Sequence, residues 1–312
     1  MTPILSVIIP TFRRTDSLRR LLEALLAQKG VQPELIVVDQ NPAGYLDGVL
    51  PSAPSIRHIV QPVANASSAR NSGFLASRGQ IILFIDDDLI PEDDFCIRAL
   101  DIFRMYPEIG CFSPLVYNAE GKDIALRQAG TKYTASFKGP DDIFAITDTI
   151  SAALFFTRDY FRKTGGFDPA LFEFARTAED QELFLRMQKR NLTLYFVSSV
   201  EVYHDETIPG GCDLRTADYW ITREKCMKAW AYRHRIHHHP PGALSANDLF
   251  QLARSGFLNK EVLSSGWGNI RKQARLLSAS IKSSGEFLNN VPHRHSDVEN
   301  IDHLINKNTT NA

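Results

Sequence analysis

The chain has 312 residues, 44% of them hydrophobic, so it is long enough to bury one large α/β core and to carry an extension. Its 35 lysines and arginines nearly balance its 36 aspartates and glutamates, and the formal net charge of −1 argues against a nucleic-acid-binding protein. Electrostatic contributions to function must therefore be local.

Scattered cysteines and the lack of long apolar segments bear on the cellular compartment. Cys96, Cys111, Cys212 and Cys226 form no CxxC pair and no dense disulfide framework, which favours a reducing compartment. The N-terminus does not resemble an export signal, and no run of about eighteen apolar residues could span a membrane. We expect a cytoplasmic protein, either soluble or peripheral on the inner face of the membrane.

Short apolar runs alternate with amphipathic segments over residues 4–85. This alternation predicts a mainly parallel sheet flanked by helices, a Rossmann-like α/β fold. The predicted strands span residues 4–9, 34–39, 56–60 and 81–85, and the predicted helices span residues 18–26 and 67–77.

The later segments are less regular. Pro91 suits the first turn of a helix that we expect to continue to about Met105, and a strand is predicted over residues 111–117. Residues 118–148 show little periodicity, which is typical of a mobile loop or of an irregular insertion into the sheet. The chain thus divides into an α/β domain (1–230), a helical extension (231–290) and a polar tail expected to be disordered (291–312).

The strongest chemical signal is FIDDDLIPED, where a buried strand is followed by Asp86, Asp87 and Asp88. Ligands of such sheets lie beyond the carboxyl ends of the strands. Clustered carboxylates need a cation or exposure to solvent, and their oxygens suit Mg²⁺ or Mn²⁺ bridging to a diphosphate. The alternative is an acidic loop that complements the N-terminus of the next helix.

Other candidate residues are ambiguous when each is taken alone. Asp39 ends a strand as either a ligand contact or a turn-forming aspartate, and Arg70 could reach a phosphate or be a solvated surface arginine. Glu179 and Asp180 begin an amphipathic helix, either favouring its dipole or holding a carboxylate that takes a proton from an acceptor hydroxyl. His204 follows the largely apolar strand LYFVSSVEVY and could complete a metal site or lie at the surface.

Taken together, these motifs resemble the inverting family-2 glycosyltransferases of the GT-A fold. The segments that carry the resemblance, between residues 6 and about 223, are SVIIPTFRR, VVDQ, SSARNSG, IDDD, and GGFD followed by EDQELFLR. Two details depart from the family pattern. The sequence VVDQNPAG lacks the usual Gly-Ser-Thr turn, and Ser67 and Ser68 stand where a glycine is frequent, which puts the details of the base pocket in doubt.

The resemblance implies a catalytic domain within residues 1–230 and a base pocket at the end of the first strand. Pro10, Thr11 and Phe12 would line this pocket, with the Phe12 ring available to stack on a pyrimidine. Asp39 would accept a hydrogen bond from the base. The donor would be a nucleotide-diphosphate sugar, linked to UDP or dTDP.

The same resemblance assigns the remaining donor and metal contacts. Asp86 would lie near the ribose, and Arg70 and Asp87 would complete the donor contacts. Asp88 and His204 would bind Mn²⁺ or Mg²⁺, and the metal would stabilise negative charge on the departing diphosphate.

For the transfer step, the resemblance implies a single displacement with inversion at the anomeric carbon. Asp180 would act as the general base and Glu179 would position the acceptor. The implied acceptor is a glycan or lipid-linked glycan in surface polysaccharide or lipopolysaccharide assembly, through hexosyl or N-acetylhexosaminyl transfer. The sequence does not identify the sugar or the acceptor.

Two rival functions share parts of this pattern. A nucleotidyltransferase would also need a similar sheet, carboxylates and a metal, but PTFRR is not the Gly-rich phosphate loop expected of one. A non-catalytic carbohydrate-binding or scaffold protein could keep the fold without turnover. A Rossmann dehydrogenase is disfavoured, because no GxGxxG follows a predicted strand.

Two C-terminal features have open roles. His234 and His237–His239 could suggest zinc, but no cysteine or carboxylate pattern completes the ligands, and a basic surface is favoured. An apolar helical stripe with basic flanks could pack on the main domain, form a homo-oligomer contact or touch an anionic membrane, and we favour the first two. The stripe consists of Ile270, Ala274, Leu277 and Ile281.

Overall fold

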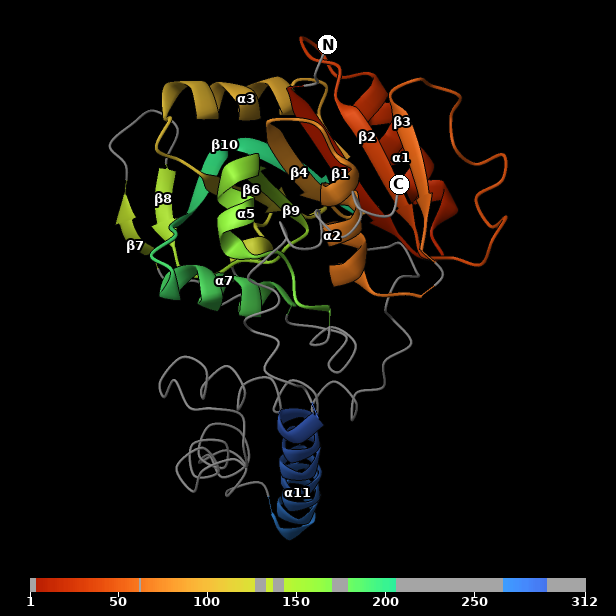
Figure 1. Ribbon diagram of the computed structural model, residues 1–312. Helices are drawn as coiled ribbons and strands as arrows, with labels where there is room; N and C mark the ends of the chain where they lie inside the picture. The colour runs from red at the N-terminus through yellow and green to blue at the C-terminus, as the bar shows by residue number, and fades with distance from the viewer. Residues whose placement is uncertain are drawn as a thin grey trace.

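The computed structural model describes residues 4–61, 63–126, 133–136, 143–169, 179–205 and 266–290 (Figure 1). Most of these residues build a ten-stranded sheet with helices on both faces. The strands are β1 (Leu5–Thr11), β2 (Glu34–Asp39), β3 (Ile56–Val60), β4 (Ile81–Ile85), β5 (Leu89–Pro91), β6 (Cys111–Tyr117), β7 (Tyr133–Ser136), β8 (Ile143–Ile146), β9 (Ala153–Thr157) and β10 (Leu194–His204).

The strand order is β3-β2-β1-β4-β9-β6-β10-β8-β7, and β5 pairs with β10 outside this path. The first four strands are parallel to one another, as predicted, so their carboxyl ends meet at one edge. Antiparallel pairs join β9 to β4 and β6, and β10 to β5 and β8. The predicted α/β class is confirmed, with a sheet that is mixed in its second half, as is common for large sheets.

The helices of the sheet domain form a layer on each face. One core cluster joins α1 and α3 to one face, and a second joins α2, α5 and α7 to the other. These helices are α1 (Thr15–Leu26), α2 (Ala66–Ala76), α3 (Phe95–Met105), α5 (Arg158–Thr164) and α7 (Glu179–Lys189).

Local sequence signals explain the first two helices. In α1 the leucines at 18, 21, 22 and 25 are fully buried, and they follow the spacing of one helical face. In α2 the Asn65 side chain accepts a hydrogen bond from the Ser68 backbone N–H at 3.0 Å, which is an N-cap.

The helix predicted from Pro91 begins instead at Phe95, which is a correction. Pro91 is the last residue of β5, which pairs antiparallel with β10 and so positions Leu89 opposite His204. Strand pairing therefore overrides the preference of proline for a first helical turn. The end of this helix at Met105 is as predicted.

Between residues 118 and 164, the structure contains strands and a helix that the sequence did not predict individually. β7 and β8 form an antiparallel pair at the end of the strand order, so the interpretation as a sheet insertion is correct for this part. β9 and α5 were not predicted, although ALFFT is a continuous apolar run of the kind found in strands buried on both faces.

The C-terminal helix α11 (Trp267–Asn290) confirms helical structure in the part of the extension that the structure describes. Trp267 is 79% exposed and Leu276 is 9% exposed. None of the described helices combines the length and apolarity that crossing a membrane would require. The expected tail (291–312), the histidines at 234 and 237–239, Cys212 and Cys226 lie outside the described residues.

Candidate functional site

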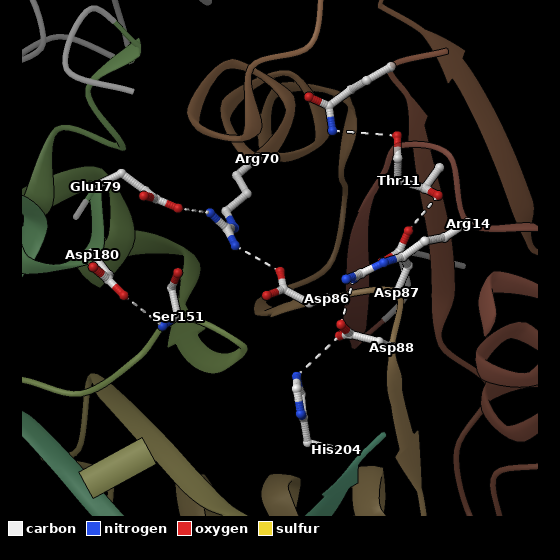
Figure 2. A network of polar contacts seen from close by, with 11 residues as sticks. Thr11, Arg14, Arg70, Asp86, Asp87, Asp88, Ser151, Glu179, Asp180 and His204 are labelled. Carbon is white, nitrogen blue, oxygen red and sulfur yellow. Dashed lines mark hydrogen bonds and ion pairs between the residues drawn. The ribbon is translucent and has the colours of Figure 1, made fainter. Parts of the chain in front are cut away.

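The polar residues that follow β1 and β4 meet because these two strands are neighbours in the sheet (Figure 2). The Thr11 Oγ1 hydroxyl donates a hydrogen bond of 2.6 Å to Asp87 Oδ2. Asp87 and Asp88 are buried, with 5% and 8% of their side chains exposed. The two strands therefore bring buried negative charge to the edge where their carboxyl ends meet.

A guanidinium from the loop between β1 and α1 neutralises this charge. Arg14 Nη1 lies 3.0 Å from Asp87 Oδ1 and 2.5 Å from Asp88 Oδ2. Burial raises the pKa of Asp87 to about 7, and Arg14 opposes that rise. The arginine thus favours the ionised form of a carboxyl that burial would otherwise protonate.

His204 reaches the site as the last residue of β10. Its Nε2 lies 3.5 Å from Asp88 Oδ1. Both Asp88 Oδ1 and His204 Nδ1 are buried without a hydrogen-bond partner, and a buried polar atom of this kind needs one. A carboxylate oxygen and an imidazole nitrogen fit a divalent metal such as Mn²⁺.

This pair does not make a complete metal site by itself. In the part of the chain that the structure describes, no group of three or more His, Cys, Asp or Glu side chains is arranged to hold a metal ion. Among the described residues, Asp88 and His204 would therefore need further ligands to hold a metal. Diphosphate oxygens are suitable hard ligands for this purpose.

Arg70 connects the Asp86–Asp88 segment to α7. Its Nη2 donates to Asp86 Oδ1 at 2.8 Å, and its Nη1 donates to Glu179 Oε1 at 3.1 Å. Its guanidinium also lies over the Phe167 ring, 5.1 Å from the centroid. Because only 3% of its side chain is exposed, the interpretation of Arg70 as a solvated surface arginine is wrong.

The two acids at the start of α7 have different surroundings. Glu179 bonds Arg70, whereas Asp180 Oδ2 accepts a hydrogen bond from the Ser151 backbone N–H at 3.2 Å (Figure 2). Burial, with a further contribution from Glu179, raises the pKa of Asp180 to about 7. A carboxyl with this pKa can exchange a proton near neutral pH, which a general base requires.

Asp39, at the end of β2, is held by two neighbours. Its Oδ1 accepts from the Asn41 backbone N–H and side-chain Nδ2, and its Oδ2 lies 3.1 Å from His58 Nε2. The bond to the Asn41 N–H is that of a turn-forming aspartate, the alternative considered for this residue. Asp39 could still contact a base, because each carboxylate oxygen has more than one lone pair.

The loop after β1 holds the other predicted base-pocket residues. Pro10 and Thr11 end β1, and Phe12 follows with its ring partly buried under the Arg13 guanidinium, 4.9 Å from the centroid. Arg13 has a φ of 59°, a left-handed conformation uncommon for non-glycine residues, and its N–H donates to Asn41 Oδ1. The β1 loop and the β2 end are thus tied together.

Sequence reasoning missed Arg14, His58, Ser151 and Phe167. A signal existed only for Arg14, because two arginines directly after the first strand face three aspartates after a neighbouring parallel strand, and buried charge requires compensation. The other three contacts depend on pairings and packing that are not visible in the local sequence.

Comparison with known proteins gives one matching family model. The model described as Glycosyl transferase family 2 matches residues 6–165, just over half of the 312-residue chain. This range includes β1 to β9 and the Asp86–Asp88 segment, and it ends before Glu179.

Two curated bacterial relatives are similar in sequence. O-antigen biosynthesis protein RfbC of Myxococcus xanthus is 25% identical over 247 residues, which is 71% of this chain and 19% of RfbC. Poly(ribitol-phosphate) beta-N-acetylglucosaminyltransferase TarP of Staphylococcus aureus is 30% identical over 134 residues, 40% of this chain and 39% of TarP. The chain therefore spans less than half the length of either relative.

Among solved structures, the mannosyltransferase PcManGT of Pyrobaculum calidifontis, in complex with GDP-Man and Mn²⁺, has a similar fold. Its TM-score is 0.56 with 13% sequence identity, covering 92% of this chain and 88% of PcManGT. At this level of identity, the similarity concerns the fold alone.

Proposed function

The chain belongs to glycosyl transferase family 2, and from that premise we propose that it transfers a sugar from a nucleoside-diphosphate donor to an acceptor hydroxyl with inversion. The observation that carries this proposal is the Arg70 bridge between Asp86 and Glu179. It joins a donor side, formed by the ends of β1 and β4, to an acceptor side, formed by the start of α7.

On the donor side, Pro10, Thr11 and Phe12 line the base pocket, and Asp39 reads the base. The anchored Asp39 carboxylate supports this role, because His58 and Asn41 fix its orientation.

The ribose and diphosphate lie beside the Asp86–Asp88 segment. Asp86 keeps 35% of its side chain exposed and can accept hydrogen bonds from a ribose, while Arg70 and Asp87 complete the donor contacts. Asp88 and His204 would hold Mn²⁺ or Mg²⁺ on this side of the site. When bound, the metal supplies electrostatic stabilisation of the charge on the departing diphosphate.

On the acceptor side, Asp180 takes the proton from the attacking hydroxyl. The acceptor oxygen forms a bond to the anomeric carbon as the bond from that carbon to the diphosphate oxygen breaks, and the proton passes to an Asp180 oxygen. The raised pKa of Asp180 and its anchoring by the Ser151 N–H support this role. Glu179, oriented by Arg70, positions the acceptor.

The relatives indicate a substrate class. RfbC is an O-antigen biosynthesis protein, TarP is a poly(ribitol-phosphate) β-N-acetylglucosaminyltransferase, and the PcManGT complex contains GDP-Man and Mn²⁺. We propose hexosyl or N-acetylhexosaminyl transfer in bacterial surface polysaccharide assembly, at the cytoplasmic side. UDP and dTDP sugars are the first donors to test, and the PcManGT complex adds GDP-mannose.

The test is a panel of UDP, dTDP and GDP sugars, with and without Mn²⁺, on the full chain, measuring donor binding and hydrolysis. Asp88→Ala should lose metal-dependent binding, and Asp180→Asn should lose turnover while retaining binding. Asp159→Asn, an aspartate on α5 with 84% of its side chain exposed, is the matched control and should behave as wild type.

Three outcomes would contradict the proposal. Binding of sugar nucleotides without hydrolysis or transfer to any acceptor tested would favour a binding or scaffold protein. Release of pyrophosphate from nucleoside triphosphates would favour a nucleotidyltransferase. Full turnover in Asp180→Asn would remove Asp180 from the mechanism.

A further inference from the structure

Arg14 is placed as a counter-cation to the aspartates that follow β4, and the roles proposed above do not use it. A single nitrogen, Nη1, contacts both Asp87 Oδ1 and Asp88 Oδ2 (Figure 2). The Arg14 side chain is 14% exposed, so the three charges lie largely away from solvent. Buried groups of this kind remain charged only when an opposite charge lies next to them.

The helix that follows does not explain this arginine. Arg14 occupies the N-cap position of α1 and makes no side-chain capping bond. Helix N-termini favour Ser, Thr, Asp or Asn and disfavour positive charge, because the helix dipole is positive at that end. Asp87 and Asp88, by contrast, stabilise the Arg14 charge directly, and Asp86 adds to this effect.

Arg14 and a metal would use the same carboxylate. Arg14 contacts Asp88 Oδ2, while Asp88 Oδ1 has no hydrogen bond and faces His204 Nε2. A divalent cation between Asp88 and His204 would lie within a few ångströms of the guanidinium, and the two positive charges would repel. A diphosphate arriving with the metal would offer the guanidinium new anionic oxygens at the same place.

We propose that Arg14 is an exchangeable counter-cation: it neutralises Asp87 and Asp88 before the donor binds, and it moves to the diphosphate when a metal occupies Asp88. This inference rests on the metal site of the proposed function. The planar guanidinium can donate two hydrogen bonds to phosphate oxygens. Its contact with the diphosphate therefore replaces its contact with the two aspartates. Because of this exchange, the chain binds the metal weakly when no nucleotide is present, and metal binding is coupled to donor binding.

The test measures two affinities in one buffer, at one pH and one ionic strength for all variants. The first is the affinity of the nucleotide-free chain for Mn²⁺, which is measured from the electron paramagnetic resonance signal of the Mn²⁺ that remains unbound. The second is binding of UDP, dTDP and GDP at saturating Mn²⁺. Arg14→Gln should bind free Mn²⁺ about tenfold more tightly, and the preferred nucleotide about tenfold more weakly, than wild type.

Two further variants complete the comparison. Arg19→Gln removes the same charge from an exposed position on α1 and controls for the change in net charge, so it should match wild type in both affinities. Arg14→Lys keeps the charge without the planar fork, and it should weaken nucleotide binding with a smaller effect on free Mn²⁺. Circular dichroism verifies that each variant is folded, and Arg14→Lys carries the test if Arg14→Gln is not.

If nucleotide-free Arg14→Gln and Arg19→Gln bind Mn²⁺ with equal affinity, the inference that Arg14 competes with the metal is wrong. Unchanged nucleotide affinity in both Arg14 variants would overturn the transfer of Arg14 to the diphosphate. If the proposed metal site itself is wrong, wild type will show no Mn²⁺-dependent binding of any nucleotide. That result is distinct from a failed exchange, in which wild-type Mn²⁺–nucleotide binding persists.

Discussion

Asp87 and Asp180 both have pKa values raised to about 7, but their surroundings suit different tasks. Asp87 is held in place by hydrogen bonds from Thr11 and Arg14, as the proposed role in donor binding requires. Asp180 has only backbone N–H donors as hydrogen-bond partners among the contacts described for it. Among the described residues, no cation forms an ion pair with this carboxylate, and the nearby Arg70 charge lowers its pKa by less than burial raises it.

The raised pKa of Asp180 predicts the pH dependence of turnover. Only the ionised carboxylate accepts a proton, so kcat/KM should rise as pH increases through about 7, level off above it and fall about tenfold per unit below it. Asp180→Asn should lower kcat by about 10²–10⁴. The measurement is a pH–rate profile with the best donor. If the residual activity of Asp180→Asn still falls below about pH 7, a group other than Asp180 causes the fall.

The Arg70 bridge predicts a large loss of stability on neutral substitution. Arg70→Gln should lower the free energy of unfolding by about 3–5 kcal/mol, because it leaves Asp86 and Glu179 without their buried cation. Arg98→Gln, which breaks an exposed pair with Asp94, should cost only about 0–1 kcal/mol. Urea unfolding measures both.

The loss of stability in Arg70→Gln should also be smaller at about pH 5 than at about pH 8. Burial raises the pKa of Asp86 and Arg70 opposes that rise, so without Arg70 the Asp86 carboxyl is more readily protonated as the pH falls. A deficit that is equal at both pH values, or one no larger than that of Arg98→Gln, would contradict the bridge.

Residues that follow buried strands were the ones that sequence alone could locate. Thr11, Asp39, Asp88 and His204 all lie at strand ends, where the rule for ligand placement applies to each strand separately. Arg14 and the burial of Arg70 could not be located in the same way. Their contacts reach across 73 and 109 positions, and they depend on how β1, α2 and α7 come together.

At the scale of elements, the close approach of α2 to the sheet positions Arg70. Gly73 lies where an added Cβ would be 2.3 Å from Ile8 Cγ2 and 3.3 Å from Val38 Cγ2, so only glycine allows this approach. Arg70 lies one helical turn earlier on α2. A displacement of the helix would therefore shift the guanidinium relative to Asp86.

Gly73→Ala should consequently destabilise the chain by about 1–3 kcal/mol through overpacking and should weaken donor binding as well. Gly268→Ala is the matched control, because Gly268 is a helical glycine in α11 with nothing within 4 Å of an added Cβ. It should be neutral or stabilising by up to about 1 kcal/mol. Thermal unfolding and nucleotide titration measure the two effects. Equal behaviour of both variants would contradict the close contact.

The predicted elements were most accurate where strands and helices alternate regularly, up to β4. Beyond that point, β5 is too short for a periodic pattern, and pairing with β10 determines its structure. β9 has a clear apolar run, but its antiparallel placement between β4 and β6 depends on tertiary context. Local pattern thus indicates that an element exists, whereas order and direction in the sheet come from non-local pairing.

At the scale of the whole molecule, the sheet is built from strands that are far apart in the chain. The first four strands pair with one another, and β4 also pairs with the later strand β9. β6 pairs with β10 along most of its length and with β9 at its first two residues, and both of these strands follow it in the chain. The site combines Thr11, from the first strand, with His204, from the last described one. Its geometry therefore depends on the entire sheet being assembled.

This strand order has a consequence for synthesis on the ribosome. When a nascent chain has emerged only as far as residue 150, β6 is complete while β9 and β10, the strands it joins in the finished sheet, have not yet emerged from the ribosome. Unpaired apolar strands of this kind invite aggregation and chaperone binding. Stalled chains that have emerged from the ribosome only as far as residue 150 should therefore be more sensitive to protease around Cys111–Tyr117 than chains that have emerged well beyond His204. The candidate site would acquire its geometry only after β10 has emerged.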